Sequence, residues 1–217
     1  MSCKLSLLVF VAAIFLAIAP TAWSAKSAPQ VIQLPAPQTT GGMPLMQALK
    51  ARHTSREFAA TPLTDQMLAN LLWAADGITR PDGKRTAPSA RNAQEIDIYV
   101  ARADGLYLYD AKANQLKPTL DQDIRAATGM QPFVKDAPVN LIYVADYARM
   151  SGAEEDKVLY SAADAALIAE NVYLFCASEN LAVVVRGAVN RAELAKAMKL
   201  RPDQKVILAQ TVGQPAK

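Results

Sequence analysis

Apolar residues recur every three to four positions in several stretches of the chain, a spacing typical of helices that bury one face. One clear example places Leu68, Leu71 and Leu72 on one side, and Thr64 precedes it as a suitable N-cap residue. The longest stretch is apolar over much more than one stripe, which favours the middle of the molecule or a subunit interface. The predicted helices cover about residues 44–53, 65–75, 121–128, 158–178 and 190–198.

Alternating and continuous apolar runs predict the strands. Residues 96–100 alternate, Asp104 and Gly105 supply a hairpin turn, and residues 106–109 return. The run 139–145 is apolar on both faces, so we expect it at the centre of a sheet. Further strands are predicted at 115–116, 181–185 and 206–212. Helices at both ends of a run of strands favour an α+β domain in which helices pack on a mixed sheet.

The first residues match a targeting segment. Lys4 precedes an apolar run at residues 5–19, and a helix-breaking proline and small residues follow. This order predicts a signal peptide at residues 1–24, with an uncleaved membrane anchor as the alternative. Residues 25–42, rich in proline and glycine, predict an extended arm that is disordered or lies across a partner subunit. We therefore expect a domain at 43–217 that is periplasmic and free of the membrane after cleavage.

Composition narrows the chemistry. The formal net charge of +3 is too small to favour nucleic-acid binding. His53 is the only histidine, and of the two cysteines, Cys3 and Cys176, the first lies in the signal segment. A histidine-rich metal site cannot be built from this set, and a Ser/His/Asp triad would depend on His53. We predict no metal site and no catalytic side chain, so that any chemistry is carried by another group.

A basic cluster follows the first predicted helix, where residues 50–58 run Lys-Ala-Arg-His-Thr-Ser-Arg-Glu-Phe. If the helix continues, Arg52 and Arg56 project to one side and can bind the same phosphate or carboxylate. The hydroxyl groups of Thr54 and Ser55 would supply neutral donors between them. The alternative for this segment in isolation is a basic helix end that only complements the helix dipole.

A long loop at residues 77–91 leads into Pro-Ser-Ala-Arg-Asn-Ala-Gln at 88–94. A loop of this length inside a compact domain is more often functional or disordered than idle. Ser161, Asp164 and Asn171 interrupt the longest helix, and ordinary hydrogen bonds between helices explain them better than ligand binding does.

Taken together, the basic cluster, the loop 88–94, the long apolar helix and a strand ending in Arg186-Gly187 resemble the nitroreductase family of FMN-dependent oxidoreductases. The closest likeness is to its SagB-type dehydrogenase-like branch, and it covers about residues 45–215. The resemblance implies FMN at the interface of an intertwined homodimer, on a mainly antiparallel sheet flanked by helices. It also implies ping-pong transfer of two electrons through the flavin to a small-molecule substrate.

The resemblance assigns cofactor-binding roles by position. Arg52, His53, Thr54 and Arg56 would bind the phosphate or ribityl chain, Ser89 and Asn92 would reach the flavin from the partner subunit, Gln131 would lie near the pyrimidine edge, and the backbone of Arg186 and Gly187 would approach N5 and O4. The Arg186 side chain would either attract an anion or reduced flavin, or face solvent.

The chain also departs from the family pattern. Relatives carry two further basic residues after the last strand, where this chain has only Lys217, so Arg85 or Arg91 would have to help hold the phosphate. NADH or NADPH is the candidate electron donor, but both are scarce outside the cytoplasm, which leaves another reductant open. The competing hypothesis is a non-enzymatic ligand-binding or interaction domain on the same fold. A third is a flavin enzyme of another outcome, such as dehalogenation or azoline oxidation.

Overall fold

The computed structural model describes residues 30–216, and within this range seven strands form one sheet. The strands are β1 Ile32–Gln33, β2 Ile96–Arg102, β3 Gly105–Asp110, β4 Gln115–Leu120, β5 Val139–Asp146, β6 Ala182–Arg186 and β7 Gln204–Gly213. Their order is β1-β4-β3-β2-β5-β7-β6, and every pairing is antiparallel. The predicted α+β class is confirmed, but the sheet of the described residues is antiparallel throughout and not mixed. The predicted signal peptide lies outside the described residues.

Four α-helices and four short 3-10 turns accompany the sheet in the described part of the chain. They are α1 Leu45–Ala51, α2 Asp65–Asp76, α3 Glu154–Ser178 and α4 Arg191–Ala197, with η1 Ala90–Asn92, η2 Arg125–Thr128, η3 Pro132–Lys135 and η4 Tyr147–Arg149. Thr64 caps α2 as predicted, because its hydroxyl oxygen accepts the Met67 N–H at 3.2 Å. The helix predicted at 121–128 shortens to η2, and Gly129 after it has an extended backbone.

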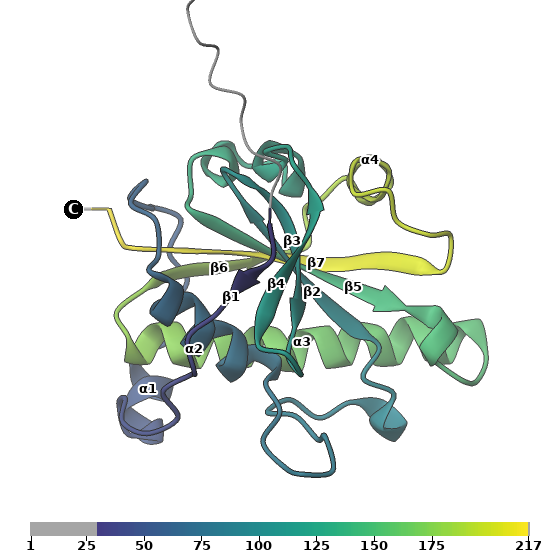
Figure 1. Cartoon of the computed structure of the whole chain (residues 1–217), viewed down its shortest axis with the longest axis horizontal. Helices are drawn as coiled ribbons and strands as arrows, with labels where there is room; N and C mark the ends of the chain where they lie inside the picture. The colour runs from purple at the N-terminus through teal and green to yellow at the C-terminus, as the bar shows by residue number, and fades with distance from the viewer. Residues whose placement is uncertain (1–29, 217) are drawn as a thin grey trace, which may run out of the picture.

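Helices cover both faces of the sheet (Figure 1). On one face α2 and α3 bury Leu72 and Ile168 in a core that includes Leu141 of β5. On the other face α4 buries Leu194 in a core that includes Ile142, the next residue of β5. Each fully buried leucine or isoleucine contributes about 1.5–3 kcal/mol. Because successive residues of β5 enter both cores, its predicted central position is confirmed.

Residues 30–43 pack against β4, α2 and α3 of the same chain. Ile32 of β1 pairs with Leu116 of β4, which extends the sheet at that edge. Further along, the Gln38 N–H donates to Asn70 Oδ1 of α2 at 2.8 Å, and the Met43 N–H donates to Ser178 Oγ of α3 at 2.7 Å. This part of the arm is therefore an ordered component of the domain that crosses α2 to reach the end of α3.

Two helices expose apolar faces. In α1, the side chains of Leu45 and Met46 are 62% and 76% exposed, so the apolar face predicted from the sequence points outward. In α3, Leu159 and Leu167 are 63% and 44% exposed, while the opposite side packs into the core. Among the described residues, α3 is the one helix long and apolar enough to cross a membrane. One side of α3 packs against the sheet, as in a core helix, and the other side leaves a stripe of apolar residues exposed.

Candidate cofactor-binding site

The basic segment is not helical. Helix α1 ends at Ala51, and Arg52 adopts φ −55° and ψ 122°. Three residues later the Ser55 N–H donates to the Val183 carbonyl of β6 at 2.9 Å, so the backbone follows the edge of the sheet. The expectation that Arg52 and Arg56 lie one helical turn apart is therefore wrong. An edge strand offers unpaired carbonyl groups, and the segment uses one of them instead of continuing the helix.

Tyr173 of α3 joins the basic segment to β6. The Arg52 guanidinium carbon lies 5.3 Å from the centre of the Tyr173 ring, and Thr54 Oγ1 lies 3.0 Å from the Tyr173 hydroxyl group. That hydroxyl also accepts the Val185 N–H at 2.9 Å. A guanidinium over an aromatic face gains about 0.5–1 kcal/mol and keeps its N–H donors free for another ligand. Tyr173 therefore positions the first part of the predicted phosphate site.

The two arginines of the segment have no acidic partner in the described chain. Neither Arg52 nor Arg56 forms an ion pair with a carboxylate within residues 30–216, whereas five other arginines do: Arg85, Arg102, Arg125, Arg149 and Arg201. Arg56 is exposed, and so is His53, whose Nδ1 lies 2.9 Å from the Ala51 carbonyl oxygen. A half-buried and an exposed guanidinium group, neither with an acidic partner in the described chain, are suitable donors for a phosphate group.

The end of β6 brings Gln131 and Gly187 to the same region. The Met130 N–H donates to the Ala188 carbonyl at 3.2 Å, which places the residues before η3 beside the residues after β6. Gly187 is exposed, with no atom within 4 Å of the position that a Cβ would occupy. Gln131 Oε1 is buried and accepts no hydrogen bond from the described residues. An open backbone edge and an unsatisfied side-chain oxygen are features expected where a ligand docks.

The Arg186 side chain points into the protein, contrary to both predicted orientations. It is 4% exposed, Nη1 donates to the Thr128 carbonyl at 2.6 Å, and Nη2 donates to Asn140 Oδ1 at 3.0 Å. Burial lowers the pKa of Arg186 to about 10. The side chain fits because Gly129 lies against it: an added Cβ there would stand 1.8 Å from Nη1. Only the Arg186 backbone is therefore available to a ligand at this edge.

Ser89 and Asn92 lie apart from this group. Their loop is held against the middle of α3, where Asp164 Oδ2 accepts the Ala90 N–H at 2.8 Å. Asp164 and Tyr173 are nine residues apart on one helix, which separates them by about 13 Å along its axis. A single chain therefore presents the basic segment and the loop as two separate surfaces.

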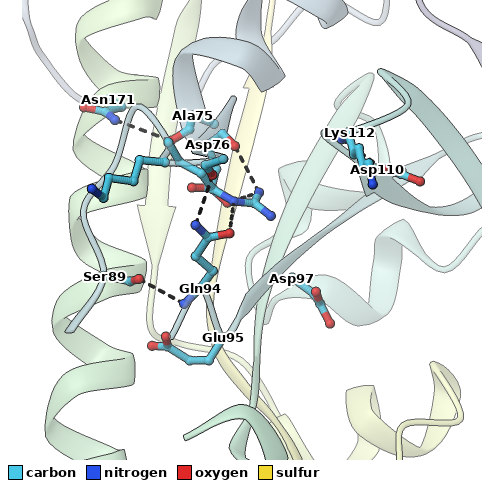
Figure 2. Close-up of polar contacts among 12 residues, drawn as sticks. Ala75, Asp76, Ser89, Gln94, Glu95, Asp97, Asp110, Lys112 and Asn171 are labelled. Atoms are coloured by element: carbon cyan, nitrogen blue, oxygen red, sulfur yellow. Dashed lines mark hydrogen bonds and ion pairs between the residues drawn. The ribbon is translucent and has the colours of Figure 1, made fainter. Parts of the chain in front are cut away.

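The loop holds a strained backbone. Arg91, Asn92 and Gln94 have φ values of 57°, 55° and 47°, in the left-handed region that non-glycine residues avoid. Each such residue costs of order 1–3 kcal/mol unless its surroundings enforce the conformation. Here Ser89 Oγ accepts the Gln94 N–H at 2.9 Å, as Figure 2 shows. Strain that is maintained in this way is common at ligand-binding sites.

The two arginines considered as substitutes in the phosphate site are engaged elsewhere. Arg85 Nη1 lies 2.7 Å from Asp76 Oδ2, and its Nε donates to Gln94 Oε1 at 3.0 Å. Arg91 donates to the Ser151 carbonyl at 2.9 Å and lies over the Tyr160 ring. Neither points to the basic segment of its own chain. Lys217, the basic residue at the C-terminus, lies outside the described residues.

Sequence reasoning missed Tyr173 and Glu95. Tyr173 is one apolar-looking position in a helix that is apolar almost throughout, so its spacing carries no signal. Glu95 precedes a strand and looks like an ordinary surface residue, yet it is completely buried. The one available signal was its position directly after Gln94, the last residue of the loop 88–94 that the sequence analysis identified.

An antiparallel sheet crossed by one long apolar helix, with an uncompensated basic segment at the sheet edge, is the arrangement that the sequence resemblance implies. The chain belongs to the nitroreductase family, whose model matches residues 49–214 and whose members are generally FMN-dependent oxidoreductases. The family model does not distinguish branches, so the SagB-type branch stays a prediction.

Individual relatives agree with this assignment. A protein of Methanocaldococcus jannaschii that is named a nitroreductase is 31% identical over 168 residues, which cover 72% of this chain and 85% of that protein. A crystal structure from Ralstonia eutropha JMP134, also named a nitroreductase, is 46% identical, with a TM-score of 0.84 over 87% of this chain and 91% of that chain. A structure from Desulfovibrio desulfuricans in complex with FMN is 24% identical, with a TM-score of 0.60 over 82% of this chain and 89% of that chain, and shows the shared fold.

Proposed function

We propose that this protein is an exported FMN-dependent oxidoreductase that passes two electrons through bound flavin in a ping-pong cycle. The observation that carries the proposal is the basic segment: Arg52 and Arg56 form no ion pair within the described chain, and Arg52 and Thr54 contact Tyr173, which binds Val185 near the end of β6. Bound FMN would accept a pair of electrons from one molecule and deliver it to another. The substrate is a small molecule, and NADH or NADPH is the first donor to test.

The residues of this chain fit such a cofactor. Arg52 and Arg56 would hold the phosphate by charge-assisted hydrogen bonds, and the Thr54 hydroxyl group would add a neutral donor. Gln131 would offer its unsatisfied side chain to the pyrimidine edge of the ring. The exposed Gly187 would let the ring approach the backbone closely. No side chain has to act as a nucleophile or general base.

A second copy of the chain would complete the site. The exposed face of α3 carries Leu159, Ala162, Ala163, Ala166 and Leu167, small and apolar residues that allow two helices to approach closely. A two-fold axis that crosses α3 between Asp164 and Tyr173 would place Asp164 of each copy opposite Tyr173 of the other. It would bring the partner copy's loop, with its Ser89 and Asn92, to the basic segment of the first copy. The separation within one chain is therefore what a homodimeric site requires.

Leu167→Glu tests the dimer. A carboxylate in the middle of the α3 stripe should convert the dimer to a monomer in analytical ultracentrifugation and abolish FMN binding together with it. Val31→Glu is the matched control, because Val31 is 53% exposed but lies in the N-terminal arm. A Leu167→Glu variant that stays dimeric and retains FMN would contradict the placement of the axis.

The cofactor itself is tested by one absorption spectrum of the purified chain lacking residues 1–24. We expect flavin bands, FMN release on denaturation, and loss of at least tenfold in FMN affinity for Arg52→Ala. Arg191→Ala is the control, because Arg191 is an exposed arginine on α4, on the opposite face of the sheet. A colourless dimer that added FMN does not stabilise against heat would instead favour the non-enzymatic binding domain. Anaerobic titration with NADH and NADPH then identifies the donor.

Export depends on the predicted signal peptide. Expression of the full chain with a C-terminal tag in a Gram-negative host should give a shorter product in the periplasmic fraction, with Ala25 as its N-terminal residue. A full-length product in the membrane fraction would support the alternative of an uncleaved anchor.

A further inference from the structure

The buried carboxyl groups of Glu95 and Asp164 lie directly behind the strained loop. Asp164 Oδ2 accepts the Ala90 N–H at 2.8 Å, and this is a contact between α3 and the stretch Ser89–Asn92. On the far side of the loop, Arg149 donates to the carbonyl groups of Gln94 and Glu95 at 3.0 Å and 2.9 Å. The three left-handed residues are thus held between α3 and η4.

The Glu95 carboxyl group is buried and forms no ion pair within residues 30–216. Its residue is 0% exposed, and neither carboxyl oxygen has a hydrogen-bond partner in the described part of the chain. In Figure 2 the Glu95 carboxyl group points toward α3, the helix that carries Asp164. A carboxylate beside a carboxylate offers no donor unless one of the two is protonated. The cavity that Asp164, Ser89 and Gln94 line measures only about 10 Å³, so it holds at most one water molecule.

The electrostatic surroundings favour a proton on this pair. Burial and, next, the Asp164 carboxylate raise the pKa of Glu95 to about 7, while the backbone N–H of Glu95 and then Arg149 oppose the shift. Of the other charged groups, Asp76 interacts with Glu95 and is paired with Arg85, and Arg149 is paired with Asp97. Glu95 and Asp164 are therefore two neighbouring acids. The nearby cations, Arg149 and Arg85, are already paired with other carboxylates.

We propose that Glu95 and Asp164 share one proton, and that this proton makes Asp164 the positioning residue for the Ser89–Asn92 loop, so that FMN binds more tightly below neutral pH. Only the effect on FMN binding rests on the proposed function; the shared proton does not. When Glu95 is protonated, its hydroxyl donates to Asp164, and Asp164 stays in place to accept the Ala90 N–H. When Glu95 loses the proton, two like charges are buried side by side, Asp164 is pushed away from Ala90, and the loop relaxes.

Two readouts test the proposal between pH 5.5 and 8.5. The first is hydrogen exchange of the Ala90 amide by NMR in the flavin-free protein, and the second is the FMN dissociation constant by fluorescence titration. We expect Ala90 protection and FMN affinity to fall together, by tenfold or more, as the pH rises through about 7. Glu95→Gln keeps a neutral donor at this position and should give flat profiles in both. Asp164→Ala should leave Ala90 unprotected at every pH.

Glu155→Gln is the matched control, an exposed carboxylate in the first turn of α3 that should leave the wild-type pH profile unchanged. Flat Ala90 protection in the wild type, or unchanged pH dependence in Glu95→Gln, would overturn the proposal. If Glu95→Gln does not fold, infrared spectroscopy of the wild type decides, since a protonated carboxyl band that persists at pH 6.5 is required. Wild-type protein that never binds FMN but shows pH-dependent Ala90 protection would refute the proposed function and leave the shared proton standing.

Discussion

Tyr173→Phe removes one oxygen atom from the junction between the basic segment and β6. The ring remains, so the Arg52 contact at 5.3 Å is retained. The Val185 N–H, which is partly buried, loses its acceptor, and an unsatisfied donor costs about 1–3 kcal/mol. For a chain of this size we expect Tm to fall by roughly 2–12 °C.

The same substitution should weaken FMN binding separately from stability. Thr54 loses its hydrogen bond to Tyr173, and the segment that carries Arg52 must then be ordered by the ligand. One net hydrogen bond is worth about 0.5–1.5 kcal/mol, which corresponds to roughly a 2- to 12-fold rise in the dissociation constant.

Fluorescence titration at 10 °C, well below the unfolding transition, measures the affinity, and differential scanning calorimetry measures Tm. Tyr160→Phe is the control on the same helix, because only the ring of Tyr160 is engaged, by Arg91. A Tyr173→Phe protein with wild-type Tm and wild-type FMN affinity would refute the argument that this hydroxyl positions the phosphate site.

Two further substitutions test the supporting structure. Gly129→Ala places a methyl group 1.8 Å from Arg186 Nη1 and must break its bond to Thr128, so we expect a loss of about 2–4 kcal/mol in urea unfolding. Gly187→Ala is the control for stability and should lose less, because no atom lies within 4 Å of its added Cβ. Arg85→Met leaves Asp76 buried without its partner. Since burial already raises the pKa of Asp76 to about 7 with Arg85 opposing, the folded state of the variant favours the protonated acid. The loss should reach about 3–5 kcal/mol at pH 8 and be smaller at pH 5, and an equal loss at both values would contradict this reasoning.

The elements with strong patterns were predictable from the sequence. The Thr64 cap and the leucine spacing located α2, and the uninterrupted run of β5 placed it at the centre of the sheet. The path after Ala51 was not predictable, because the Val183 carbonyl that ends the helix lies 128 positions away in the sequence. The spacing of the charges predicted that the helix continues through this segment. The contact with the sheet edge, which the local sequence does not indicate, makes the segment extended instead.

The candidate site also has features that were predictable from the sequence and features that were not. The residue types around Arg52 and Arg56 indicated an anion site, and both side chains remain uncompensated within the described chain. The direction of the Arg186 side chain depended on Gly129 and Asn140, residues that no short motif connects to it. Burial of Glu95 had no sequence signal, since a glutamate before a strand is normally solvated.

The basic segment has a second consequence through its bond to β6, the last strand of the sheet. By occupying the Val183 carbonyl, the residues proposed to bind phosphate also shield a strand border that could otherwise recruit a neighbouring molecule. A change that detaches the segment would therefore leave a protein that is both unable to retain its flavin and prone to self-association. In cells, poor solubility could then be mistaken for the primary defect when the loss of ligand came first.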